Sequence, residues 1–188
     1  MELRAIVRPS EKFQVRILRP SEFEIMRDAM DLNTKKICTS PLLTGMGYAE
    51  LQRLRENPEL LDGKFIYLPR GSMLKVKAKQ RERAIRLSDM GKTLLPDLFQ
   101  VPYLLPELPA LDMKLRRLSI RILDGNPVNN KAFRKTWESW LVFCYPDKAL
   151  QIALTQGHTT TTQYGHCLNI PFEEEDRKEM RKWMEGWI

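Results

Sequence analysis

Gln156-Gly157-His158-Thr159-Thr160-Thr161-Thr162-Gln163-Tyr164-Gly165-His166-Cys167-Leu168-Asn169 is the stretch on which the interpretation of this chain depends. It holds both histidines of the protein, together with a glycine turn, four threonines, a tyrosine and a cysteine. Such a concentration of hydrogen-bonding and nucleophilic side chains indicates a functional site. A polar loop before a last helix explains the same residues equally well, so the rest of the chain has to decide between the two.

The composition is that of one soluble globular domain. The chain has 188 residues, 43% of them hydrophobic and 29% charged, which is enough apolar material for a core. No apolar run approaches the roughly 18 residues of a membrane span, and the charged N-terminus is unlike a signal peptide, so we expect a cytoplasmic protein. The three cysteines form no CxxC pair, so we expect no metal site and no disulfide framework. We also expect no small-molecule cofactor.

The net positive charge of the chain favours a polyanionic partner. The formal net charge is +7, and Lys and Arg gather in residues 75–86, 114–121 and 131–135. A basic face favours a polyanion, nucleic acid first. Many basic proteins bind no nucleic acid, so charge alone does not decide the function.

Periodicity predicts an α+β fold that is mainly α, a helical bundle with a small three-stranded antiparallel sheet. Apolar spacing gives a helix over residues 20–33 and a second helical region over 35–56, broken by Pro41, Gly45 and Gly47. The three strands are expected at 64–68, 72–76 and 84–87, around the basic tip 77–83. Further helices are expected over 88–95, 111–122, 131–145, 148–155 and 171–187. Residues 1–19 are interpreted as a short extended arm, and residues 20–188 as the domain.

The order of polar motifs resembles a known family. Lys131-Ala132-Phe133-Arg134 opens a helix, one short helix follows, and then come Gly157 and His158. This order is similar to the catalytic domain of the tyrosine recombinases, the phage-type and Xer-type integrases. That family has a His/Lys-x-x-Arg box, then a Gly-His box, then a nucleophilic tyrosine about nine residues after the histidine.

Three other segments extend the resemblance over roughly residues 15–188. Residues 42–51, LLTGMGYAEL, resemble the family's first box, Leu-x-Thr-Gly-x-Arg-x-x-Glu-Leu. The basic hairpin resembles one whose lysine reaches the cleaved site, and either Lys77 or Lys79 matches that lysine. Residues 166–175 resemble archaeal and archaeal-virus members in particular. The family's separate N-terminal core-binding domain is expected to be absent, because only about 19 residues precede the first helix.

The resemblance implies phosphodiester cleavage in double-stranded DNA through a 3′-phosphotyrosyl intermediate. Negative charge develops on the phosphate oxygens, and two arginines hold it by forked hydrogen bonds. Arg134 would be the second arginine, with Lys131 and His158 as flanking donors, and Glu50 would orient its neighbours. The hairpin lysine would protonate the leaving oxygen. The other residues that we expect to contact DNA are Arg81, Arg83, Lys135, Thr159 and His166.

Two positions depart from the family pattern. Gly47 stands where the first arginine is expected, and Cys167 stands where the tyrosine is expected. A thiolate is a poor nucleophile toward phosphodiesters, so we expect little or no recombination. Tyr164 is the alternative nucleophile. A helical turn of about 5 Å separates it from the tyrosine position, which is more than catalytic geometry usually tolerates.

Three interpretations remain open. The chain is a recombinase catalytic domain with impaired activity, a non-catalytic DNA-binding relic or regulator, or a basic helical interaction protein with no site. Family members assemble as homo-oligomers on DNA, and the last helix carries an apolar stripe suited to docking on a neighbour, Met180, Trp183, Met184 and Trp187. Packing of this stripe on the protein's own core is an equally good interpretation.

Overall fold

A computed structural model describes residues 15–69, 82–101, 105–125, 127–157 and 172–188. Its α-helices are α1 (Pro20–Ala29), α2 (Leu32–Thr44), α3 (Tyr48–Glu56), α4 (Asp89–Leu94), α5 (Leu108–Ile122), α6 (Asn130–Cys144), α7 (Ala149–Gln156) and α9 (Glu174–Met184). The strands are β1 (Leu61–Asp62), β2 (Phe65–Leu68) and β3 (Arg83–Arg86), and short 3-10 turns span Pro58–Leu60, Leu95–Gln100 and Pro146–Lys148. The predicted fold class, mainly α with a small three-stranded antiparallel sheet, is confirmed.

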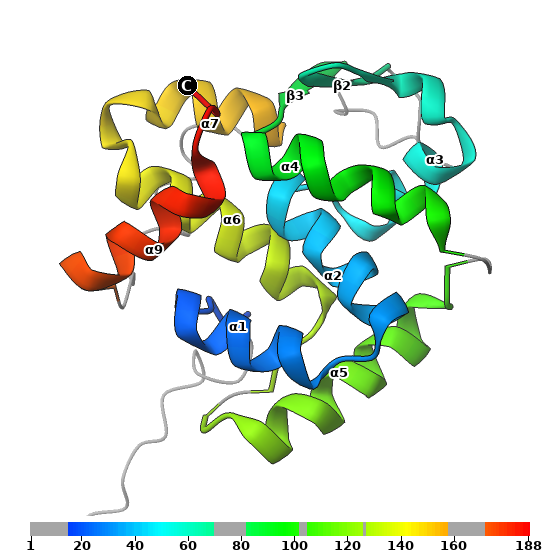
Figure 1. Cartoon of the computed structure of the whole chain (residues 1–188), viewed down its shortest axis with the longest axis vertical. Helices are drawn as coiled ribbons and strands as arrows, with labels where there is room; N and C mark the ends of the chain where they lie inside the picture. The colour runs from blue at the N-terminus through cyan, green and yellow to red at the C-terminus, as the bar shows by residue number, and fades with distance from the viewer. Residues whose placement is uncertain (1–14, 70–81, 102–104, 126, 158–171) are drawn as a thin grey trace, which may run out of the picture.

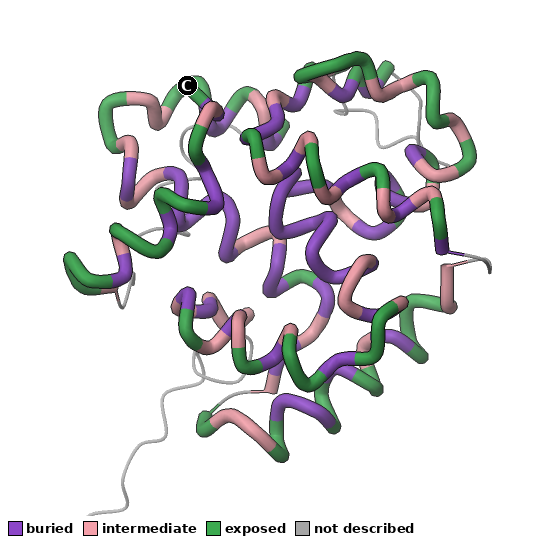
Figure 2. Tube along the Cα trace, viewed as in Figure 1, coloured by how far each residue is buried: buried purple, intermediate pink, exposed green. Residues whose placement is uncertain are grey.

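Helices α2 and α6 form the centre of the molecule and pack against each other (Figure 1). Every residue of α2 from Ile37 to Thr44 is buried, which is typical of a helix enclosed on all sides. On α6, Phe133, Trp137 and Trp140 are fully buried. Figure 2 shows the same two helices as the main buried part of the trace. These three aromatic residues of α6 therefore belong to the core and are not available to a ligand.

The predicted helix over residues 20–33 is wrong, because the chain forms two helices there. α1 ends at Ala29, and α2 begins after Asp31, whose carboxylate accepts a 3.0 Å hydrogen bond from the backbone N–H of Thr34. This N-cap satisfies a backbone donor that a continuous helix would bond internally. Leu32, which the apolar spacing assigned to the buried face, is 67% exposed.

Pro41 does not interrupt α2, contrary to prediction. A proline inside a helix removes one backbone hydrogen bond and costs about 3 kcal/mol. Burial of Leu42 and Leu43 directly after it offsets that cost. The helix instead ends at Gly45, whose φ of 66° is left-handed and whose N–H donates to the carbonyl of Pro41 at 2.8 Å.

The sheet has the order β1-β2-β3, with both pairs antiparallel. β2 and β3 lie where two of the strands were predicted, and Ile66 pairs with Ile85, both buried. The third strand is Leu61–Asp62, which was not predicted, whereas the expected strand over 72–76 lies outside the described residues. β3 contacts α7, so the sheet reaches the end of α7 that precedes the glycine–histidine stretch (Figure 1).

Both ends of the described chain pack on this core. Leu18 is buried, its N–H donates to Thr136 Oγ1, and its carbonyl accepts from Trp140 Nε1, each at 2.9 Å. Residues 15–19, the described part of the predicted arm, are therefore docked on α6.

The apolar stripe of the last helix is buried in the protein's own core. Trp183 meets Phe23 edge to face, with ring centroids 5.3 Å apart, and Trp187 stacks on Tyr145. Met180 and Met184 are fully buried as well. Of the two interpretations of this stripe, packing on the protein's own core is the one observed. Within the described segments, no helix is long and apolar enough to cross a membrane.

Candidate functional site

Arg134 lies in the second turn of α6 and connects three segments that are far apart in sequence. Its Nη2 donates a 2.5 Å hydrogen bond to the carbonyl oxygen of Gln156, the last residue of α7. Its Nη1 lies 3.3 Å from Oε2 of Glu50 in the first turn of α3. Its side chain is 24% exposed. The arginine of the second box is therefore held by the first box and by the residue that precedes Gly157.

Glu50 is the anionic centre of this cluster. Its side chain is 2% exposed, and its Oε2 accepts a 2.8 Å hydrogen bond from the backbone N–H of Gly47. That bond caps α3, because the third helical residue satisfies a backbone donor at the N-cap. Its other oxygen, Oε1, lies 2.7 Å from Nη2 of Arg83. One buried carboxylate thus lies between two guanidinium groups.

Arg83 was not expected beside Glu50 and Arg134. It was expected to contact DNA as part of a basic hairpin, but its side chain is only 8% exposed. It is the first residue of β3 and shares the inward face with Ile85, because side chains alternate along a strand. The period-two spacing of Arg83, Ile85 and Leu87 is the signal in the sequence that could have indicated an inward side chain.

The cluster combines two guanidiniums with two buried carboxyl groups. Arg83 and Arg134 both lie against the carboxylate of Glu50. Burial lowers the pKa of Arg134, Glu50 and Glu138 oppose this shift, and Arg83 adds to it by repulsion. Glu138, one turn further along α6, is also buried; burial raises the pKa of its carboxyl, and Arg134 and Lys135 oppose that rise. The partly exposed guanidinium of Arg134, with Lys131 and Lys135 on the same helix, still favours an anionic ligand.

Two glycines allow these segments to approach each other. Gly45 has a φ of 66°, and a Cβ atom there would lie 2.1 Å from Oε1 of Gln156. Gly157 has a φ of 69°, and a Cβ atom there would lie 2.9 Å from Nη1 of Arg83. Any side chain at either position would displace a neighbour of Arg134. Close packing therefore explains Gly45 in the first box and Gly157 in the Gly-His box.

Gly47, in contrast, does not need to be glycine. Its backbone is extended, with φ −74° and ψ 161°, which any residue adopts. A Cβ atom there would lie 3.6 Å from Arg134 Nη1 and 3.6 Å from Glu50 Oε2, which is ordinary contact. The backbone and the space around the Cβ position at residue 47 therefore do not require glycine.

The other predicted site residues divide into two groups. Lys131 is exposed in the first turn of α6, and Lys135 is half-buried beside Arg134. Residues three apart on a helix lie on one side, so Lys131 and Arg134 are neighbours on the surface of α6. The rest lie outside the described residues: Lys77, Lys79, Arg81, His158, Thr159, Tyr164, His166 and Cys167.

The described cysteines are poor nucleophiles. Cys38 and Cys144 are buried free thiols. Burial raises the pKa of both, that of Cys144 to about 11, so both are protonated near neutral pH. No group of three or more His, Cys, Asp or Glu side chains within the described ranges is placed to hold a metal ion.

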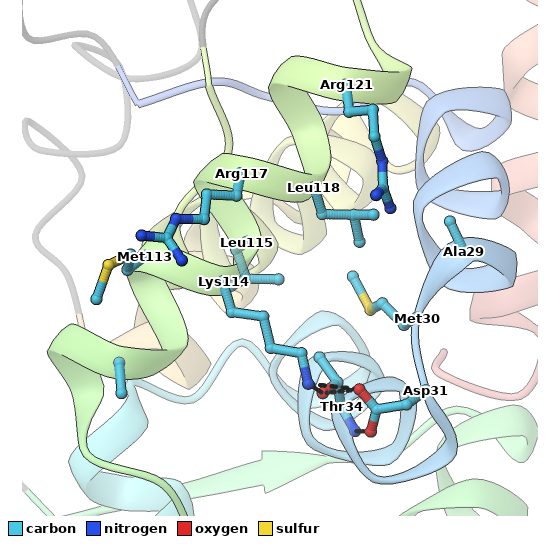
Figure 3. Close-up of a pocket in the computed structure, with 11 residues that line it drawn as sticks. Ala29, Met30, Asp31, Thr34, Met113, Lys114, Leu115, Arg117, Leu118 and Arg121 are labelled. Carbon is cyan, nitrogen blue, oxygen red and sulfur yellow. Dashed lines mark hydrogen bonds and ion pairs between the residues drawn. The ribbon is translucent and has the colours of Figure 1, made fainter.

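A pocket of about 340 Å³ lies elsewhere, between α5 and the α1–α2 junction (Figure 3). Met30, Leu115 and Leu118 line it, and Lys114 Nζ donates to Asp31 Oδ2 at 2.5 Å and to Thr34 Oγ1 at 2.7 Å. No residue of the Arg134 cluster lines it. The pocket is therefore separate from the cluster of buried charges.

Comparisons with known proteins support the fold. No protein-family model and no curated protein matches the chain. Among solved structures, the chain is similar to the crystal structure of XerA recombinase, with a TM-score of 0.62 and 16% sequence identity. The match covers 90% of this chain and 65% of that recombinase. At this identity the likeness shows the fold alone, which is that of a tyrosine-recombinase catalytic domain.

Proposed function

We propose that this chain is a recombinase-type domain that binds double-stranded DNA and holds a backbone phosphate at Arg134, with strand cleavage impaired. The observation that carries this proposal is the position of Arg134. Its guanidinium is fixed by Gln156 and Glu50 at the point where the first box, the second box and the start of the Gly-His stretch meet.

A fixed guanidinium suits a phosphate. The planar fork of arginine matches two phosphate oxygens, and a fork that is already oriented loses less freedom on binding. Lys131 and Lys135 lie on the same helix and add positive charge, as does the net charge of +7. These charges attract the DNA backbone without regard to its sequence.

The impairment follows from the nucleophile. In the family's reaction a tyrosine oxygen attacks phosphorus, the bond from phosphorus to the 5′ oxygen breaks, and that oxygen takes up a proton. Cys167 has no phenol oxygen, and Gly47 brings no guanidinium to the developing charge. Removal of one such donor typically reduces the rate by 10²–10³-fold.

A second candidate function is a non-catalytic DNA-binding regulator derived from an integrase. The joint presence of Gly47 and Cys167 at the two most demanding positions favours it. Both candidates require DNA binding through Arg134 and differ in whether any cleavage remains. Assembly into homo-oligomers on paired sites, and an origin in an archaeal virus or mobile element, belong to the first candidate.

Binding of a labelled duplex of mixed sequence at a series of salt concentrations tests the proposal. We expect Arg134→Ala to weaken binding on the order of 10-fold or more, because a hydrogen-bonded charge pair with phosphate is lost. The slope of log K against log salt should fall by about 0.9. Arg181→Ala, an exposed arginine on α9, is the matched control and should leave both quantities unchanged. Wild-type affinity and slope in Arg134→Ala would refute the proposal.

A further inference from the structure

Arg83 reaches the same carboxylate as Arg134, from the other side of the cluster. We propose that Arg83 is a second guanidinium of the phosphate site and supplies, for DNA binding, the positive charge that position 47 lacks. This inference rests on the proposed function, because it concerns the same site. It makes Arg83 a phosphate-binding residue supplied by β3, in addition to its place in the basic hairpin.

The geometry of Glu50 supports a paired arrangement. Arg83 Nη2 lies 2.7 Å from Oε1, and Arg134 Nη1 lies 3.3 Å from Oε2 of the same group. The two guanidiniums therefore contact the two oxygens of one carboxylate, and Arg83 is close enough to Arg134 to repel it. A phosphate bound at this cluster has oxygens for both arginine forks.

The burial of Arg83 points to a ligand. Its side chain is 8% exposed, yet its Nε–H has no hydrogen-bond acceptor among the described residues. A buried donor without an acceptor is rare and destabilising, and each such case needs an explanation.

Position 47 explains why the second guanidinium comes from β3. Gly47 lies at the N-cap of α3, beside both Arg134 and Glu50, and brings no side chain to the cluster. The Glu50 oxygen that faces Arg83 receives no bond from Gly47, whose N–H goes to the other oxygen. Arg83 therefore pairs with the Glu50 oxygen that the Gly47 N–H does not bond, so the carboxylate that contacts Arg134 also holds a guanidinium from β3.

The equivalence of residues 47 and 83 can be tested by a rescue. The same labelled duplex is titrated at several salt concentrations with Arg83→Ala, Arg134→Ala, Arg83→Ala/Gly47→Arg and the control Arg181→Ala. We expect Arg83→Ala to weaken binding on the order of 10- to 100-fold and to lower the salt slope by about 0.9. Adding Gly47→Arg should restore the slope and most of the affinity. A merely structural role of Arg83 would not be rescued in this way.

The possible results separate this inference from the proposed function. If Arg134→Ala loses affinity while Arg83→Ala binds like wild type, Arg83 is not part of the phosphate site and the inference fails alone. If Arg134→Ala also binds like wild type, the proposed function fails. If Gly47→Arg does not restore the slope, Arg83 does not stand in for residue 47. Should circular dichroism show that Arg83→Ala is unfolded, Arg83→Gln keeps the length and polarity of the side chain and takes its place with the same expected results.

Discussion

Arg134 Nη2 lies 2.5 Å from the carbonyl oxygen of Gln156, so α6 is bonded to the last residue of α7 directly before Gly157 and His158. The two motifs that suggested a site in the sequence therefore meet in space. Glu50, which is 84 positions before Arg134, completes the contact from the first box. This convergence is what distinguishes a site from a set of separate polar segments.

Glu50→Gln should destabilise the protein strongly. The substitution removes the carboxylate that pairs with both Arg83 and Arg134, and breaking a buried pair typically costs 3–5 kcal/mol. Urea unfolding measures the change in the free energy of unfolding. Glu179→Gln removes an exposed carboxylate that pairs with Lys182 on α9, and we expect it to change stability by less than about 1 kcal/mol. Similar changes in the two variants would contradict the buried cluster.

Gly45→Ala should destabilise more than Gly63→Ala. Both glycines have left-handed backbones, with φ of 66° and 54°, so alanine is strained by roughly 1–2 kcal/mol at either position. Only at Gly45 would the new Cβ also collide with Gln156, whereas nothing lies within 4 Å at Gly63. We expect a further loss of about 1–3 kcal/mol for Gly45→Ala in urea unfolding. Equal losses would show that the packing of Gln156 on Gly45 does not contribute to stability.

Asp31→Asn should reduce stability at neutral pH and have little effect in acid. Burial acts to raise the pKa of Asp31, but hydrogen bonds from Lys114 and Thr34 outweigh it and lower that pKa below its usual range. A lowered pKa in the folded state contributes stability above the unfolded value, about 3.9, and this stability is lost as pH falls below it. Asparagine keeps one oxygen for the N-cap but places an amide nitrogen where Oδ2 accepts from Lys114 and Thr34, so only the part of the difference that depends on pH reports the charge. A difference between the two proteins that does not shrink from pH 6 to pH 2 would contradict this assignment.

Cys38 and Cys144 should resist thiol reagents in the native protein. Burial raises the pKa of both thiols, that of Cys144 to about 11, and also blocks access. In a Cys167→Ser variant we expect slow labelling by a chromogenic disulfide reagent at pH 7.5 and rapid labelling of both thiols in denaturant. Fast native labelling would show that these cysteines are accessible.

The fold class could be predicted from the sequence because it depends on local patterns. The apolar spacing of α5 and α6 and the alternation of β2 and β3 lie within single elements, and these agreed with the structure. The helix over residues 20–33 was wrong because Asp31 forms a cap that apolar periodicity does not detect. The predicted break at Pro41 was wrong because tertiary burial of the helix outweighed the local effect of proline.

The site was harder to predict, because its contacts join distant segments. The pair of Arg83 with Glu50 spans β3 and α3, and no spacing in the sequence indicates it. The apolar stripe around Trp183 had two interpretations, since a buried face looks the same in sequence whether it meets its own core or a neighbour. Tertiary pairing decided both cases.

Covalent trapping on a nicked suicide duplex tests the account most directly. In that substrate the strand beyond the cleavage point is lost by dissociation, so any cleavage leaves the protein bound to DNA, and denaturing electrophoresis detects the adduct. We predict no adduct from the wild-type chain and an adduct from the Gly47→Arg/Cys167→Tyr variant, which restores both departing positions. An adduct from the wild-type chain, or none from a folded, DNA-binding double variant, would contradict the account.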